Sequence, residues 1–163
     1  MFRHVITALS LVVVFCASSV SAQTKSWQAG VAKTVITPRE YMWMSGYASR
    51  TKPAEGKVHD LWAKALVLED ASGKRCVLVT MDLIGIDRAL AEEICADVKK
   101  SHGFSRDQIM LSTSHTHCGP VVGRNLLTMY NFNDAEHKKV FAYADDLHAK
   151  VAIKEFLPEG IVF

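Results

Sequence analysis

The stretch WAKALVLEDASGKRCVLVTMDL, residues 62–83, decides the fold. Two apolar runs rich in β-formers, 62–68 and 75–83, flank a short polar segment, 69–74. Polar residues favour a turn there, and Gly73 can adopt a positive φ at no steric cost. The pattern predicts a β-hairpin.

Two further strands are expected on either side of this hairpin. Residues 27–36 alternate loosely between apolar and polar and stop at Pro38, which cannot join a strand ladder as a donor. Residues 108–113 form a second short apolar run. Residues 160–163 predict the opening of another strand, so we expect the chain to stop part-way through its fold.

Two helices are expected between and after these strands. Asp87 can cap the first, whose apolar positions fall four apart and which Gly103 would end. The second begins at Asp134, and Pro158 follows its end. Their apolar faces are formed by Leu90, Ile94 and Val98, and by Val140, Ala144, Leu147 and Val151. This order of elements predicts an α/β or α+β fold, with a mixed β-sheet covered by helices.

Residues 1–22 have the composition of a cleaved secretory signal. A basic start is followed by an apolar run and by the small residues Val20-Ser21-Ala22. The run is shorter than the roughly 20 apolar residues that a membrane span needs. We therefore expect a protein that is secreted or periplasmic, with residues 23–163 forming one domain.

Charge and cysteine content narrow the class of protein further. The formal net charge is +2, and no dense Lys/Arg block forms an electrostatic footprint, so we expect no nucleic acid partner. Cys76, Cys95 and Cys118 lie in the expected mature chain, and an odd number leaves at least one free thiol. Cys76 and Cys95 lie on apolar faces, which predicts that both are buried in the core.

The run Ser112-Thr113-Ser114-His115-Thr116-His117-Cys118-Gly119-Pro120 is the candidate site, because it brings two imidazoles and a thiol to the end of a strand. If this backbone stays extended, both rings project from one face, about 6 to 7 Å apart at the Cα atoms. Zinc accepts such nitrogen ligands, but a catalytic zinc takes three protein ligands, which two histidines do not supply. Candidate partners to hold the rings are Asp82, Thr113, Ser114 and Thr116. The alternative is a loop whose imidazoles bond backbone carbonyls.

Five segments spread along the chain match one known family in order and spacing. They are AGVAKTVIT (29–37), MSGY (44–47), the run from His59 to AKALVLE (63–69), VTMDL (79–83) and MLSTSHTHCGP (110–120). Together they resemble the neutral, non-lysosomal ceramidase family. The resemblance extends over almost the whole of residues 23–163, and the segment that contains the histidines is the most diagnostic.

This resemblance implies a zinc-dependent amidase that hydrolyses the N-acyl bond of ceramide to give sphingosine and a fatty acid. His115 matches the family's first zinc ligand, and His117 matches the catalytic histidine beside the substrate amide. The family's remaining zinc ligands, a histidine, a glutamate and a tyrosine, come from sequence beyond this chain. The resemblance thus implies the N-terminal portion of a larger catalytic domain, with Zn²⁺ as cofactor and a lipid as substrate. We expect weak or no amidase activity from this chain alone.

The chain departs from the family at several positions. Cys118 stands where the family usually has serine, and residues 121–125 replace a glycine-rich stretch. Asp60 and Leu61 follow His59 where the family tends to carry an arginine two residues on. An alternative is therefore a relative that acts on another N-acyl lipid.

Three other interpretations stay open. Cys118 could act as a thiol nucleophile, although neighbouring residues on a strand point apart and pair poorly with each other. The chain could be a non-catalytic secreted binding module. Its apolar loop, with Met42, Trp43, Met44 and Tyr47, is suited either to peripheral membrane contact or to packing against a further part of the fold.

The other histidines of the expected helices, His102, His137 and His148, are expected at the surface or at element boundaries.

Overall fold

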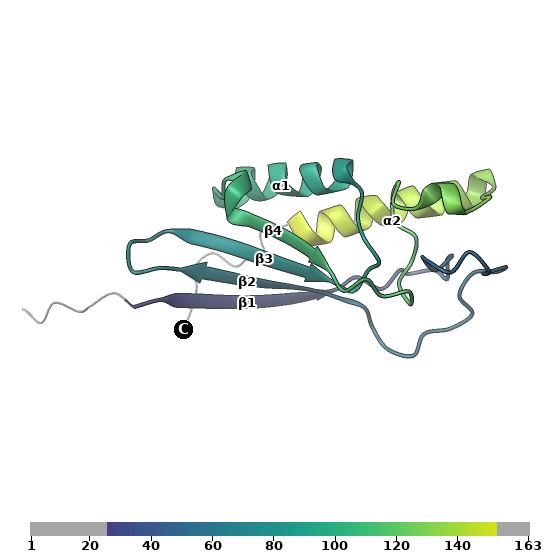
Figure 1. Cartoon of the computed structure of the whole chain (residues 1–163), viewed down its shortest axis with the longest axis horizontal. Helices are drawn as coiled ribbons and strands as arrows, with labels where there is room; N and C mark the ends of the chain where they lie inside the picture. Colours follow the sequence, from purple (N-terminus) through teal and green to yellow (C-terminus); the bar gives the residue numbers. More distant parts are fainter. Residues whose placement is uncertain (1–25, 153–163) are drawn as a thin grey trace, which may run out of the picture.

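A computed structural model describes residues 26–152 of the chain. Four strands form one sheet in the order β1-β2-β3-β4 (Figure 1). They are β1 (Gln28–Val35), β2 (Trp62–Glu69), β3 (Arg75–Met81) and β4 (Ile109–Thr113). The first three are antiparallel neighbours, whereas β3 and β4 are parallel. The predicted hairpin is β2–β3, and the two flanking strands are confirmed.

Two helices cover one face of this sheet (Figure 1). Helix α1 (Arg88–His102) connects the parallel strands β3 and β4, and α2 (Asp134–Ala152) follows β4. The Asp87 side chain accepts a hydrogen bond from the Leu90 N–H at 3.1 Å, and Gly103 ends α1 with a φ of 74°. Short 3₁₀ turns occupy Arg106–Gln108 (η1) and Leu127–Met129 (η2).

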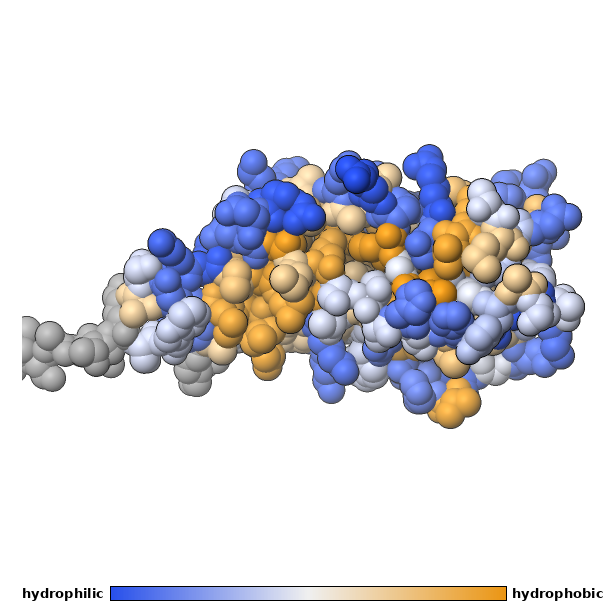
Figure 2. Space-filling model, viewed as in Figure 1, coloured by the Kyte–Doolittle hydropathy of each residue, from blue (hydrophilic) through white to orange (hydrophobic). Residues whose placement is uncertain are grey.

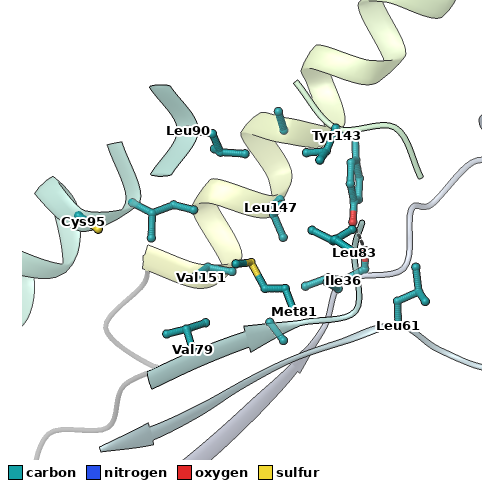
Figure 3. Packing of buried hydrophobic residues seen from close by; sticks show 14 of the residues in the cluster. Ile36, Leu61, Val79, Met81, Leu83, Leu90, Cys95, Tyr143, Leu147 and Val151 are labelled. Atoms are coloured by element: carbon teal, nitrogen blue, oxygen red, sulfur yellow. Dashed lines mark hydrogen bonds between the residues drawn. The ribbon is translucent and has the colours of Figure 1, made fainter. Parts of the chain in front are cut away.

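The hydrophobic core lies between the helices and the sheet (Figure 3). Because side chains alternate along a strand, Val77, Val79 and Met81 of β3 all point toward the helices and are buried. The apolar stripes of the two helices meet them from above, as their spacing predicts. The Tyr143 hydroxyl donates a hydrogen bond of 2.7 Å to the Ile36 carbonyl, and burial raises the pKa of Tyr143 far above its ordinary value. This bond ties α2 to the end of β1.

The opposite face of the sheet carries an apolar row. The strand register places Val31, Leu66, Leu78 and Met110 side by side, and Val31 and Met110 are 77% and 63% exposed. Figure 2 shows apolar side chains gathered over the strands. Cys76 is exposed on this face, so its predicted burial is wrong, whereas Cys95 is buried as expected. Alternation assigns Cys76 to the face opposite Val77, away from the helices.

The architecture is thus a mixed four-stranded sheet with two helices, of the α+β class, in line with the sequence expectation. Within residues 26–152, no helix is long and apolar enough to cross a membrane. The expected signal at residues 1–22 and the expected strand at 160–163 lie outside the described residues.

Hydrogen bonds at the first turn of α2 join this helix to the loop before β2, and we expect them to stabilise the fold less at acid pH. Glu136 accepts hydrogen bonds from the Asn133 N–H at 3.0 Å and from the Trp43 indole at 2.6 Å. These two bonds, that from Asn133 first, hold the pKa of Glu136 below its ordinary value of 4.5. The lowered pKa stabilises the fold above pH 4.5, and this contribution disappears as the pH falls through the folded-state pKa.

As the pH is lowered below 5, the free energy of unfolding of Glu136→Gln should therefore fall less steeply than that of the wild type. Denaturant unfolding at several pH values below 5 measures this free energy. An equally steep fall in the variant and the wild type would contradict a role for Glu136 in the acid sensitivity.

Candidate active site

The histidine loop begins where β4 ends, at Thr113. The Ser114 N–H still donates to the Met81 carbonyl at 3.0 Å, but His115 then adopts a left-handed conformation with φ of 56°. The condition that His115-Thr116-His117 stays extended is therefore not met, because the chain turns sharply at His115. The two rings nevertheless lie close, with centroids 5.3 Å apart and in an edge-on arrangement.

His115 is exposed, and one of its nitrogens is already held. Its Nδ1 lies 3.0 Å from the Ile84 carbonyl oxygen, which can only accept a hydrogen bond. In the neutral ring, this contact requires the proton on Nδ1 and leaves the lone pair on Nε2. A histidine fixed in this way through its other ring nitrogen is typical of a metal ligand.

Three of the four expected side-chain partners, Asp82, Thr113 and Thr116, form hydrogen bonds with other groups and not with the imidazoles. Asp82 accepts a hydrogen bond from the Trp62 N–H at 2.9 Å, and the Thr116 hydroxyl accepts one from the Cys118 N–H at 3.2 Å. The Thr113 hydroxyl donates to the same Ile84 carbonyl that His115 contacts, at 3.4 Å. Asp82 therefore fixes the start of β2 and does not orient His115. A carbonyl acceptor carries no side-chain signature, so the sequence could not single out Ile84.

His117 is half-buried against a second segment of the chain, residues 42–50. Its ring lies 4.4 Å from the Tyr47 ring, centroid to centroid. Its Nδ1 is buried and has no hydrogen-bond partner among the described residues. Gly46, with φ of 76°, lies so close that an added Cβ would fall 2.8 Å from the ring Cε1 and closer still to Nδ1. Only glycine allows this approach.

Backbone hydrogen bonds hold residues 42–50 against the strand-like segment after His117. Met44 and Pro120 form an isolated antiparallel bridge. The Ser45 N–H donates to the Gly119 carbonyl at 2.8 Å, and the Val121 N–H donates to the Trp43 carbonyl at 2.9 Å. The apolar loop therefore packs partly on this chain itself, with Trp43 against the rings of Tyr130 and Phe132. We name residues 42–50 the clamp loop.

Arg50, at the end of the clamp loop, reaches back to the histidine segment. Its Nη2 donates to the His117 carbonyl at 2.6 Å, and its Nε donates to the Gly46 carbonyl at 3.1 Å. Its guanidinium carbon lies 5.3 Å from the centre of the Tyr47 ring. Nothing in the sequence signals the bond from Arg50 or the approach of Gly46 to His117, since both contacts join segments about 70 residues apart.

A groove of about 1070 Å³ opens beside the histidine loop. Cys118, the residue after His117, lines it together with buried or half-buried apolar residues and exposed charged residues. The apolar lining includes Met42, Met44, Leu61 and Pro120, and the charged lining includes Arg39, Glu40, Lys57 and Lys139. Lys139 pairs with Glu40, and Lys57 pairs with Asp60, each at 2.7 Å.

The other cysteines and histidines named in the sequence do not complete a metal site with His115 among the described residues. Cys76, Cys95 and Cys118 are all free thiols. His148 pairs with Asp97 at 3.1 Å, and His137 contacts the Phe132 ring. Within residues 26–152, no three His, Cys, Asp or Glu side chains are arranged to hold a metal ion.

Comparison with known proteins identifies the family. The model of the neutral/alkaline non-lysosomal ceramidase, N-terminal, matches residues 27–145. This chain belongs to that family. Neutral ceramidase of Pseudomonas aeruginosa is 34% identical over 139 residues, and that of Drosophila melanogaster 31% over 114. These alignments cover 82% and 68% of this chain.

The solved structures agree with the sequence relatives. The crystal structure of the Pseudomonas aeruginosa neutral ceramidase superposes with a TM-score of 0.58 and 29% identity, over 74% of this chain. This chain spans 21% of the length of the curated Pseudomonas ceramidase and 16% of the Drosophila one. It therefore corresponds to one part of the neutral ceramidase fold.

Proposed function

We propose that this chain is the N-terminal portion of a zinc-dependent amidohydrolase that hydrolyses the N-acyl bond of ceramide to sphingosine and a fatty acid. The observation that carries the proposal is the pair of rings at the end of β4. One has a fixed tautomer and a free Nε2, and the other is packed beside it at 5.3 Å. In this account His115 is a metal ligand and His117 is the catalytic histidine.

The residues present fit a zinc ion at His115. The Ile84 carbonyl orients the ring, and the left-handed backbone at His115 turns the imidazole out of the sheet edge into an exposed position. Such strained conformations in non-glycine residues cluster at functional sites. When bound, zinc polarises a carbonyl oxygen and lowers the pKa of a bound water. Its remaining ligands would come from sequence outside residues 26–152.

His117 is suited to act on the substrate rather than on the metal. Its ring is held between Tyr47 and the Gly46 backbone, which restricts rotation. An imidazole in such a fixed position can donate a hydrogen bond to the oxyanion that develops on an amide carbonyl, or to the leaving nitrogen. This role requires the ring to face the same space as Nε2 of His115.

The groove beside Cys118 supports a lipid substrate. Its methionine, leucine and proline side chains suit a hydrocarbon chain, and the charged side chains that also line it suit a polar head group. Tyr41 and Val58 also line it and are 60% and 99% exposed. Exposed apolar residues at a groove mouth favour peripheral contact with a membrane surface.

We also propose that residues 1–22 act as a signal that directs export of the chain.

A hybrid enzyme tests this proposal. In the hybrid, residues 27–145 of this chain replace the aligned segment of the Pseudomonas aeruginosa neutral ceramidase. We expect the hybrid to hydrolyse a fluorescent ceramide, to lose this activity with a zinc chelator and to regain it with added zinc. The unmodified chain should show weak or no hydrolysis, because a catalytic zinc needs three protein ligands.

Two controls separate the alternatives. A panel of other N-acyl lipids distinguishes ceramide from a related substrate. A folded hybrid that binds zinc but cleaves no N-acyl lipid would contradict the enzymatic proposal and favour a binding module. If the unmodified chain hydrolysed ceramide, and His115→Ala abolished this activity, the proposal that other zinc ligands lie outside residues 26–152 would be contradicted.

A further inference from the structure

We propose that Arg50 is the positioning residue for His117, and that it fixes the imidazole by joining the clamp loop to the histidine loop. This inference rests on the catalytic role proposed for His117. Arg50 is not placed in contact with substrate. It acts through the backbone of His117 and through the aromatic ring that covers the imidazole.

The first support is the pair of carbonyl groups that Arg50 joins. One belongs to His117 itself, at 2.6 Å from Nη2, and the other belongs to Gly46, at 3.1 Å from Nε. Gly46 is the residue whose backbone approaches the His117 ring. The guanidinium therefore fixes the distance between the His117 backbone and the Gly46 backbone, against which the His117 ring packs.

The second support is the way in which the same side chain holds Tyr47. The guanidinium carbon lies 5.3 Å from the Tyr47 ring centre, and that ring lies 4.4 Å from the His117 ring. Tyr47 also has a left-handed backbone, with φ of 54°, directly after Gly46. A left-handed backbone at a non-glycine residue such as Tyr47 is costly unless the surroundings maintain it. Arg50 supplies contacts on both sides of this turn.

The third support is that no hydrogen bond among the described residues holds Nδ1 of the imidazole. Unlike His115, whose Nδ1 contacts the Ile84 carbonyl, His117 has a buried Nδ1 without a partner among these residues. The orientation of the His117 ring therefore depends on packing against Gly46, Tyr47 and the His115 ring. A lysine at position 50 keeps the charge, but a single ammonium lacks the planar fork that reaches two carbonyls and covers a ring.

The test uses the purified chain and NMR, which needs neither metal nor activity. In the wild type we expect cross-relaxation between the Tyr47 and His117 rings, and an upfield ring-current shift of the His117 ring protons. Arg50→Met should abolish both signals, and Arg50→Lys should weaken them while the amide spectrum stays dispersed. Lys52→Met is the matched control, because Lys52 pairs with Glu55 at the surface, and it should change neither signal.

The hybrid enzyme supplies a second, kinetic measurement. Arg50→Lys should lower kcat about 10- to 100-fold with little change in KM, since small misplacements of a catalytic group are costly. If the Arg50 variants keep the ring signals of the wild type, the proposal is overturned, whatever the activity. It is also overturned if both variants unfold, because Arg50 would then stabilise the fold in general. An inactive wild-type hybrid would contradict the proposed function alone, since the NMR result would still stand.

Discussion

Replacing His117 with alanine in the hybrid enzyme is expected to lower kcat for ceramide about 10²- to 10⁴-fold, the range that a positioned acid–base group supplies. The reason is that, in the proposed mechanism, the His117 ring donates a hydrogen bond to the reacting amide. Its ring is 5.3 Å from His115 and is held by Tyr47. Steady-state kinetics with a fluorescent ceramide measure the loss.

A matched control separates this effect from the removal of any imidazole. His148 lies on α2 and pairs with Asp97, so His148→Ala should leave kcat within about two-fold of the wild type. KM should change little in the His117 variant, since the lost interaction belongs to the transition state. A His117→Ala hybrid that retains the wild-type kcat would remove His117 from the mechanism.

Gly46→Ala is expected to reduce the free energy of unfolding by about 2 to 4 kcal/mol, as a sum of backbone strain and steric overlap. Gly46 has a φ of 76°, which disfavours any residue with a Cβ. The new methyl group would also overlap the His117 ring, 2.8 Å from Cε1. Relief requires the clamp loop to move away from the histidine loop, so the hybrid should lose activity as well.

Gly73→Ala is the matched control for this prediction. Gly73 has a similar φ of 84°, but nothing lies within 4 Å of its added Cβ. The strain alone should cost about 1 to 2 kcal/mol. Denaturant unfolding of the two variants measures the difference, which isolates the contact with His117. Equal destabilisation by both substitutions would show that the Gly46 contact is unimportant.

Much of the fold was predictable because its signals are local. The turn at Gly73, the Asp87 cap and the apolar stripe of α2 each depend on residues within a few positions of one another. Cys76 shows where such signals fail. Both faces of β3 carry apolar side chains, since Leu78 lies on the open face and Val77 on the covered one. Alternation predicts that the two faces differ, but it does not say which of them a helix covers.

The site was predictable only in part. Residue type and spacing single out His115 and His117, and the structure places their rings close together. The left-handed turn at His115 was not foreseen, because serine, threonine and histidine carry no strong signal for it. The Ile84 carbonyl and Arg50 were missed for a different reason. Both act through backbone atoms of segments 31 and 67 residues away in sequence, and such contacts leave no pattern in a single sequence.

Zinc content tests the central claim, the division of labour between the two histidines, most directly. The measurement is zinc per molecule in the dialysed hybrid, its His115→Ala variant and its His117→Ala variant, by mass spectrometry of the metal. We predict about one zinc in the wild type and in His117→Ala, and a loss of most of it in His115→Ala, because ligand removal weakens the site. Full zinc content in His115→Ala, or its loss in His117→Ala alone, would contradict the account.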